Sequence, residues 1–339
     1  MAESLRLVRP VFDDAPLPGM IGSSPAMREV YCLVRRVAPL DDPVTIVGET
    51  GTGKELVARA LHALSPRRGR PLIALNAAAV PESVFESELF GHERGAFSDA
   101  KREKAGLLEV ADRSTFYMDE LGALSQVCQA KLLRVIEEGA ARRVGGLILR
   151  SAAPRWVVSC QGRDPQSRIG CGVREDLWQR VSGAIITLPP LRERAGDIPL
   201  LVAHFLNLRG YPTDWFEESA LAVLATAPWR GNVRELKQLV SRVVVGHGDE
   251  RVSAVAVRRE VEAIAGKTRV PVLDPPAPSV DELLAVCEAH GWQASRIAAA
   301  LGLGRTAFFK RLKAWGVSLR TLHEFTIVHR SSRNSRELR

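Results

Sequence analysis

The sequence predicts an α/β fold: a parallel sheet flanked by helices, followed by a helical subdomain and a C-terminal all-α helix-turn-helix. Three observations lead to this prediction. Short apolar runs alternate with helical patterns as far as Pro189-Pro190, and no strand signal follows. A proline-rich stretch, Gly266–Ser279, then separates a last helical segment from the rest. Strands that alternate with helices favour a parallel sheet, because each helix returns the chain to the edge where the next strand begins.

The candidate strands are five short apolar runs bounded by Gly, Pro or charged residues: Val44–Val47, Leu72–Leu75, Thr115–Met118, Trp156–Ser159 and Ile185–Leu188. Apolar residues then recur at helical spacing in Ile198–Leu208, Glu217–Ala227 and Val233–Val245. These patterns divide the chain into an N-terminal tail (1–19), an α/β core (20–190), a helical subdomain (191–265), a linker (266–280), a helix-turn-helix domain (281–318) and a basic tail (319–339). Because only about 19 residues precede the core, we expect no N-terminal regulatory domain, so a separate regulatory protein, or expression and assembly, would control this chain.

Composition indicates a globular protein with an anionic partner. Of the 339 residues, 46% are hydrophobic, and the net charge is +8. From Asp281 to Arg339, ten Lys and Arg stand against five Asp and Glu, which is typical of a nucleic-acid-binding end. There is no run of 18 apolar residues and no N-terminal signal segment, and the five cysteines are scattered. We expect a cytoplasmic protein with reduced thiols, no membrane contact and no zinc site.

A glycine-rich loop lies in Val44–Glu55, which reads VTIVGETGTGKE and leads from an apolar strand into a helix. Glycines let backbone N–H groups approach phosphate oxygens, the helix N-terminus adds positive potential, and the lysine reaches the terminal phosphates. The pattern predicts a nucleotide site made by Gly48, Glu49, Thr50, Gly51, Thr52, Gly53, Lys54 and Glu55. The general pattern has Ser or Thr after the lysine as a Mg²⁺ ligand, whereas Glu55 could orient a metal-bound water.

A second acidic motif, STFYMDEL at Ser114–Leu121, ends an apolar strand in Asp119 and Glu120. A carboxylate at a strand tip beside a phosphate-binding loop can hold Mg²⁺, and its neighbour can polarise an attacking water. The alternative is an ordinary strand followed by a solvated acidic pair. The glycine-rich loop upstream favours the catalytic interpretation.

Several stretches in register resemble the central domain of sigma-54-dependent activators, the NtrC-type enhancer-binding proteins of the AAA+ class. Between about Met20 and His247 they are GETGTGKE, LNAAAVPESVFESELFGHERGAF, FYMDELGALS, QAKLLRVIEEG, RRVGG, VREDLWQRV, LPPLRERAGDIP and WRGNVRELKQLV. The family also carries Glu after the lysine. The resemblance implies an AAA+ ATPase with a helical lid, ATP and Mg²⁺ as cofactors, and a hexamer-type ring. It also implies an upstream enhancer site on double-stranded DNA and RNA polymerase with its sigma-54 factor as partner.

The resemblance also implies roles for the residues around the nucleotide. Asp119 would bind Mg²⁺, and Glu120 would prepare the attacking water. Asn76, in LNAAA, would hold that glutamate in check until the ring assembles.

Three arginines take family roles under the same resemblance. Arg174 and Arg180, in VREDLWQR, would reach the γ-phosphate of the neighbouring subunit, and Arg234, in GNVREL, would sense the nucleotide of its own subunit. An arginine that stabilises charge on the transferred phosphoryl group contributes about 10³–10⁵ in rate. The alternative for Arg174 or Arg180 is a surface salt bridge.

The chain departs from the family in the loop that contacts sigma-54. The family reads GAFTGA, whereas Gly95–Ala100 reads GAFSDA. Phe97 is kept and Ser98 retains a hydroxyl, but Asp99 replaces a glycine, adding charge and removing the freedom to adopt a positive φ. This change leaves the ATPase prediction intact and bears on sigma-54 contact alone.

A second departure lies after the fourth predicted strand, where the family shows a Thr-Asn pair followed by Arg-Asp. Here Ser159–Asp164 reads SCQGRD, so Cys160 and Gln161 occupy the sensor position. A longer amide orients a water with looser geometry. We therefore expect slower hydrolysis than in typical relatives.

The C-terminal segment reads as two helices, Ala294–Leu301 and Arg305–Trp315, joined by Gly302-Leu303-Gly304. This spacing fits a helix-turn-helix and resembles the Fis-type domain that ends many family members. The expected DNA contacts are Arg305, Thr306, Lys310, Arg311 and Lys313. The alternative is a helical hairpin used only for dimerisation.

Three functions are compatible with these motifs. The leading one is a transcription activator that binds DNA sequence-specifically and uses ATP hydrolysis in a ring to remodel the sigma-54 promoter complex. GAFSDA supports an alternative, a regulator that binds ATP and DNA independently of sigma-54. A third possibility is an AAA+ remodeller of another protein or nucleic acid, which the helix-turn-helix disfavours.

Overall fold

The computed structural model describes residues 14–162, 171–247 and 251–267, together with 287, 289–294 and 297. The chain forms two compact units, Met1–Ala263 and Ile264–Arg339. The positions predicted to contact DNA (Arg305, Thr306, Lys310, Arg311 and Lys313), the C-terminal tail and most of the linker lie outside the described residues. In the described part of the chain, no helix is long and apolar enough to cross a membrane.

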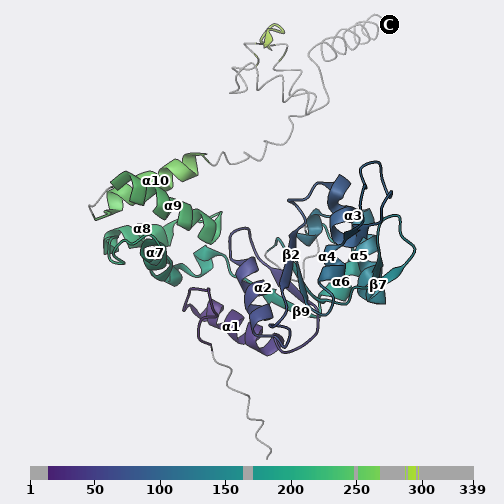
Figure 1. Ribbon diagram of the computed structural model, residues 1–339. Helices are drawn as coiled ribbons and strands as arrows, with labels where there is room; N and C mark the ends of the chain where they lie inside the picture. Colours follow the sequence, from purple (N-terminus) through teal and green to yellow (C-terminus); the bar gives the residue numbers. More distant parts are fainter. Residues whose placement is uncertain are drawn as a thin grey trace, which may run out of the picture. The chain divides into compact units, whose positions relative to one another are not determined.

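A five-stranded parallel sheet forms the centre of the first unit (Figure 1). Its order is β2 (Leu72–Asn76), β5 (Thr115–Asp119), β8 (Arg155–Cys160), β1 (Val44–Val47) and β9 (Ala184–Thr187). The five predicted strands are these five, and the predicted α/β class is confirmed. The register pairs Asn76 with Asp119 and Val47 with Cys160, so the carboxyl ends of neighbouring strands meet at one edge.

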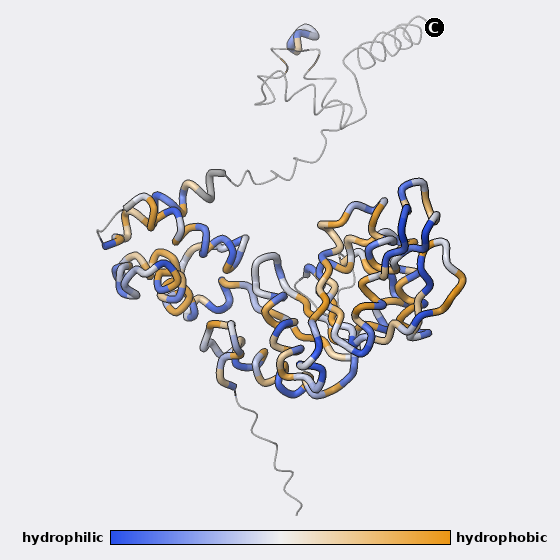
Figure 2. The backbone as a smooth tube through the Cα atoms, viewed as in Figure 1, coloured by the Kyte–Doolittle hydropathy of each residue, from blue (hydrophilic) through white to orange (hydrophobic). Residues whose placement is uncertain are grey.

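Two helical layers cover the sheet. Alternate strand residues face opposite sides, and the strands are mostly orange in Figure 2 because their residues are largely hydrophobic. On one side, Val44 and Ile46 pack in a core with α1 (Pro25–Val37) and α2 (Lys54–Ala63). On the other side, Val47 packs in the core that includes residues of four helices: α3 (Glu82–Phe90), α4 (Leu107–Val110), α5 (Gln126–Glu138) and α6 (Glu175–Val181).

Two short antiparallel hairpins extend from the second helical layer. One pairs β3 (Gly91–His92) with β4 (Lys104–Ala105), and the other pairs β6 (Ala140–Arg142) with β7 (Leu149–Ser151). The sequence did not predict them, because strands of two or three residues are too short to show an alternating pattern.

The lid follows the sheet and is helical, as predicted. Two 3₁₀ turns, η2 (Leu191–Glu193) and η3 (Ala195–Asp197), lead into it, and we call residues 189–197 the hinge. The lid helices are α7 (Ile198–Asn207), α8 (Glu218–Thr226), α9 (Asn232–His247) and α10 (Ala254–Lys267). Their apolar faces bury Phe205, Leu224, Leu239 and Val257, which gives the lid a core of its own.

Candidate nucleotide-binding site

The predicted phosphate-binding loop joins β1 to α2. Gly51 and Gly53 have φ angles of 80° and 107°, a left-handed conformation that glycine adopts without strain. Lys54 is the first residue of α2 and is 9% exposed. Its Nζ donates to the carbonyls of Gly48 (2.9 Å) and Glu49 (3.2 Å). Burial lowers the Lys54 pKa, and the negative charges of Asp119 and Glu120 oppose this shift, so a phosphate bound here would further stabilise the ammonium.

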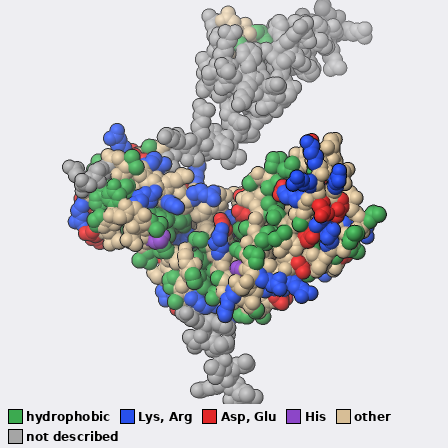
Figure 3. Space-filling view, in the orientation of Figure 1, with side chains coloured by type: hydrophobic (Ala, Val, Ile, Leu, Met, Phe, Trp, Pro, Cys, Tyr) green, Lys and Arg blue, Asp and Glu red, His purple; other side chains and the backbone are tan. Residues whose placement is uncertain are grey.

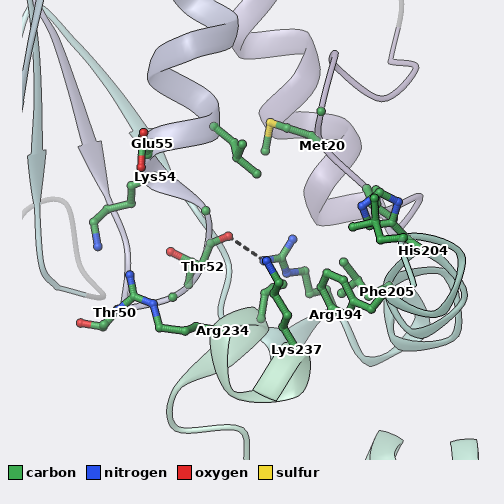
Figure 4. A pocket seen from close by; sticks show the side chains of 18 of the residues that line it. Met20, Thr50, Thr52, Lys54, Glu55, Arg194, His204, Phe205, Arg234 and Lys237 are labelled. Atoms are coloured by element: carbon green, nitrogen blue, oxygen red, sulfur yellow. Dashed lines mark hydrogen bonds between the residues drawn. The ribbon is translucent and has the colours of Figure 1, made fainter. Parts of the chain in front are cut away.

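A cavity of about 520 Å³ lies between this loop, the hinge and the lid. Figure 4 shows Lys54 and Arg234 approaching it from opposite sides, from α2 and α9. The lining comes from four segments: Gly19–Ile21, Thr50–Leu56, Asp119 with Glu120, and the lid residues Leu201, His204, Phe205, Leu208, Val233, Arg234 and Lys237, together with Arg194. Charged groups therefore gather at the loop, and apolar side chains of α7 form the opposite wall.

Asp119 and Glu120 follow one another at the carboxyl end of β5 and both line the cavity. Asp119 Oδ1 accepts hydrogen bonds from the Tyr117 hydroxyl (2.9 Å) and the Ser159 hydroxyl, and its Oδ2 accepts one from Asn76 Nδ2 (3.1 Å). Glu120 has a φ of 57°, and its N–H donates to Ser159 Oγ at 3.0 Å. Ser159 thus holds both the carboxylate and the strained backbone beside it.

The side chain of Asn76 is held in position against Asp119. Its Oδ1 accepts the N–H groups of Ala78 and Ala79 at 2.9 and 3.2 Å, which fixes the amide with its NH₂ toward the carboxylate. Among the described residues, no hydrogen bond joins Asn76 to Glu120. The predicted restraint on Glu120 is therefore not a direct contact in this structure, although Asn76 contacts the residue next to it.

The sequence analysis missed Ser159 and Tyr117 as parts of this site. Both lie on central strands and would be taken as core residues, since Tyr117 and Ser159 are buried at 2% and 0% exposure. Burial raises the Tyr117 pKa, so the hydroxyl keeps the proton that it donates to Asp119. One feature of the sequence could have indicated their role: Tyr117 and Ser159 each carry a hydroxyl near the carboxyl end of a predicted strand, close to where the acidic pair lies.

Arg174 and Arg180 lie at α6 and are not among the residues that line the cavity of their own chain. Arg174 forms a bidentate pair with Asp176 (3.0 and 2.8 Å), which lowers the Asp176 pKa to about 2. Arg180 pairs with Glu137 at 3.1 Å, and its side chain is 59% exposed. Both arginines therefore pair with carboxylates of their own chain, and neither lines the cavity that contains Arg234.

Close backbone packing connects the segment before α6 to the acidic pair. The carbonyl of Cys171 lies where a Cβ on Gly122 would have to be, so only glycine fits at position 122. Gln129 Nε2 donates to the Gly172 carbonyl (2.9 Å), and Gln129 Oε1 accepts the Arg174 N–H (2.8 Å). The start of α6 is thus fixed against η1 (Leu121–Ala123), which directly follows Glu120.

The altered sensor segment lies at the carboxyl end of β8. Cys160 is 1% exposed, and burial raises the pKa of its thiol to about 12. Gln161 is exposed, and its carbonyl accepts a hydrogen bond from the Cys171 thiol at 3.4 Å. Cys160 is therefore a neutral core residue, and Gln161 is the side chain that reaches solvent at this position.

The loop 95–100 lies between β3 and β4. It closes on itself, because the N–H of Gly95 donates to the Ala100 carbonyl (2.8 Å) and the N–H of Ala100 to the Phe97 carbonyl (2.9 Å). Phe97 is 44% exposed, with its ring 4.9 Å from that of His92. Asp99 does not adopt a positive φ, so replacing glycine there introduces no backbone strain of that kind.

An ion-pair cluster holds the base of this loop. Arg143, beside the β6–β7 hairpin, is 8% exposed and contacts three carboxylates: Glu93 (3.4 Å), Glu103 (3.1 Å) and Glu109 (3.0 Å). Arg150 adds contacts to Glu93 and Glu109 at 3.4 and 3.6 Å. Figure 3 shows basic and acidic side chains side by side over this part of the core. These ion pairs therefore join the two hairpins near the ends of the strands, where the connecting loops begin.

Comparison with known proteins identifies the chain. The sigma-54 interaction domain matches residues 20–187, and the AAA+ ATPase lid domain matches residues 192–271. The crystal structure of NtrX from Brucella abortus in complex with ATP superposes with a TM-score of 0.64 and 33% identity, covering 88% of this chain and 69% of that one. The chain belongs to the family of sigma-54-dependent activators.

Curated relatives support the same family. The Nif-specific regulatory protein of Azotobacter vinelandii is 38% identical over 319 residues, 89% of this chain and 60% of that protein. The DNA-binding transcriptional regulator NtrC of Azospirillum brasilense is 44% identical over 252 residues, 73% of this chain and 52% of that protein. The chain thus spans between half and two thirds of these relatives, and the family resemblance of the motifs is confirmed.

Proposed function

We propose that this activator binds and hydrolyses ATP in the cavity between the phosphate-binding loop and the lid. The observation that carries this proposal is the convergence of Lys54, Asp119, Glu120 and Arg234 on one cavity. Backbone N–H groups of the loop and Lys54 would hold the phosphates, and the apolar side chains of α7 would face the base. The ATP complex of the NtrX relative supports the choice of nucleotide.

Asp119 fits a magnesium ion. Its carboxylate faces the cavity, and Mg²⁺ binds proteins through one or two carboxylates together with phosphates and waters. The ion would neutralise charge on the phosphates when bound. Three hydrogen bonds, from Tyr117, Ser159 and Asn76, fix the orientation of Asp119 beforehand.

Glu120 would accept the proton of the attacking water. Its backbone is held by Ser159, so the side chain projects from a fixed point at the end of β5. Asn76 would act on it through Asp119, because these two side chains are hydrogen-bonded. Gln161 would occupy the sensor position, and we keep the prediction that its longer amide slows hydrolysis.

Assembly into a hexamer-type ring would complete the site. Arg174 directly precedes α6 and Arg180 lies on it; neither lines the cavity of their own chain, and both are exposed enough to reach a neighbour. Positive charge supplied by another subunit would make hydrolysis depend on assembly. Arg234 would sense the nucleotide from the lid of the same chain.

The remaining predictions concern partners. Phe97, Ser98 and Asp99 would contact sigma-54, and the match of the sigma-54 interaction domain favours this function over the sigma-54-independent alternative. The predicted helix-turn-helix domain (281–318) would bind an enhancer site in DNA, which the name of the Azospirillum brasilense relative supports. The proposal also includes the predicted division into domains and a cytoplasmic location.

Capture of sigma-54 by the full chain, with a transition-state analogue of ATP, tests this function. We expect stable capture with the analogue and none without nucleotide, because only the assembled ring would present the loop. Failure of capture alongside normal ATP hydrolysis would favour the sigma-54-independent regulator. Absence of both activities would contradict the proposed ATP site itself.

A further inference from the structure

The outer side of the phosphate-binding loop is bonded to the hinge and the lid. Three successive carbonyls accept hydrogen bonds there: Thr50 from Asn232 Nδ2 (3.0 Å), Gly51 from the Val233 N–H (3.0 Å) and Thr52 from Arg194 Nη2 (2.9 Å). A Cβ on Gly51 would clash with the carbonyl of Gly231. The loop and the start of α9 therefore fit together as closely as two backbones can.

Glu49, which directly precedes these three residues, adds a charged contact. Its carboxylate accepts two hydrogen bonds from Arg192, at 2.9 and 2.7 Å, and one from Asn232 Nδ2 at 3.1 Å. Side-chain exposure is 18% for Glu49 and 27% for Arg192. One carboxylate thus bonds the hinge through Arg192 and the lid through Asn232.

Phosphate binding alone gives no reason for an acidic residue at this place. Phosphates are held by backbone N–H groups and by Lys54, and a carboxylate so close has the same sign as the ligand. The pair with Arg192 offsets that charge, and a bidentate arginine also fixes direction. Glu49 and Arg192 are both explained if their function is to hold the loop, the hinge and the lid in a fixed relative position.

Asn232 transmits the contact to the lid. It is fully buried, has a φ of 53°, and its Oδ1 accepts the N–H of Leu191 at 2.7 Å. It is also the first residue of α9, the helix that carries Arg234 and Lys237 into the cavity. Holding Asn232 in place therefore holds the start of α9, and with it the backbone positions of Arg234 and Lys237.

We propose that Glu49 is a positioning residue that couples the phosphate-binding loop to the lid: by holding Arg192 and Asn232 it sets the position from which α9 presents Arg234 to the nucleotide. This inference rests on the proposed ATP site. It assigns Glu49 no contact with the reacting atoms, and it predicts that Glu49 and Arg192 act as one unit.

A double-mutant cycle on the full chain tests the coupling. The variants are Glu49→Ala, Arg192→Met and both together, titrated with the slowly hydrolysed analogue ATPγS. We expect each single variant to raise the Kd about tenfold. The double variant should raise it less than about threefold beyond either single variant, because the first substitution has already removed the contact. Arg192→Lys keeps the charge but not the bidentate geometry and should recover part of the affinity.

The matched control is Arg242→Met, which removes an ion pair within the lid. Arg242 is on α9 and pairs with Glu260 on α10 at 3.1 Å, and this change should leave the Kd within about twofold. Should either single variant fail to fold by its melting curve, Glu49→Gln and Arg192→Lys replace them in the cycle.

Two outcomes overturn the proposal. Single variants that bind ATPγS like the unaltered chain show that the contact does not matter, and a double variant that multiplies both effects to about a hundredfold shows that the residues act separately. An unaltered chain that does not bind ATPγS contradicts the proposed ATP site, which is a different result.

Discussion

The phosphate-binding loop and the loop 95–100 are both glycine-containing turns of the same α/β core, but they are held in different ways. The phosphate-binding loop is bonded along its length, through Glu49 and the carbonyls of Thr50, Gly51 and Thr52. The loop 95–100 closes on itself and is joined by charge at its base, while Phe97 is 44% exposed. A loop that is hydrogen-bonded along its length to the hinge and the lid can move only together with them. A loop held at its base can present its tip to a partner.

The largest expected effect concerns chemistry at Glu120, which lines the same cavity as the phosphate-binding loop. Glu120→Gln keeps the shape of the side chain but removes the base, so we expect hydrolysis to fall about 10³-fold. Binding of ATPγS should stay within about twofold, because Glu120 is not needed to hold phosphates. Steady-state assays measure the rate of ATP hydrolysis, and titrations measure the Kd for ATPγS. The control is Glu218→Gln, at an exposed position on α8. Equal losses in both would place Glu120 among the binding residues.

The second prediction concerns the base of the loop 95–100. Arg143→Met removes the cation that contacts all three carboxylates and leaves Glu93 and Glu109 with Arg150 alone, so we expect the free energy of unfolding to fall by about 2 kcal/mol. Capture of sigma-54 should be lost while the Kd for ATPγS is unchanged. Urea unfolding and capture assays measure both, with the exposed Arg134→Met as control. A matching change in the Kd would show that the two loops are not held independently.

The third prediction concerns the tip of that loop. Phe97→Ala should weaken capture of sigma-54 about tenfold, because an exposed aromatic ring at a contact is a major source of binding energy. ATP hydrolysis should not change. Val127→Ala, at a position that is 63% exposed on α5, is the control for loss of surface apolar area. Equal capture by Phe97→Ala and the unaltered chain would exclude the tip from the contact.

The smallest effect is expected at the altered position of the loop. Asp99→Gly restores the family residue, but Asp99 shows no positive φ, so no strain is relieved. We expect the free energy of unfolding to change by less than about 1 kcal/mol and capture by less than about threefold. An increase in capture of tenfold or more would show that the charge of Asp99 opposes the partner.

The strands and the site motifs were predictable because their signals are local. β1 matches the predicted Val44–Val47 run, and the glycines that bring N–H groups toward phosphate lie within one short segment, 48–53. The bond between Asn76 and Asp119 was not predictable, because it depends on the pairing of β2 with β5. The contact of Glu49 with Arg192 joins residues 143 positions apart, and nothing in either segment alone indicates the other.

The buried hydroxyls show a related limit. Ser159 and Tyr117 lie within apolar runs, where a periodic pattern assigns them to the core. Their function comes from facing Asp119, and side-chain direction across neighbouring strands requires the register. The roles of Arg174 and Arg180 stay predictions, since they depend on a second chain.

The packing of Gly122 against Cys171 has a consequence for a ring of identical subunits. The backbone that follows Glu120 touches the segment that leads to Arg174, so close packing connects the acidic pair of each chain to an arginine proposed to serve the next subunit. In the proposed ring, a change at one site would then alter the next site in a fixed direction. Such a contact would make the subunits hydrolyse ATP in a fixed order.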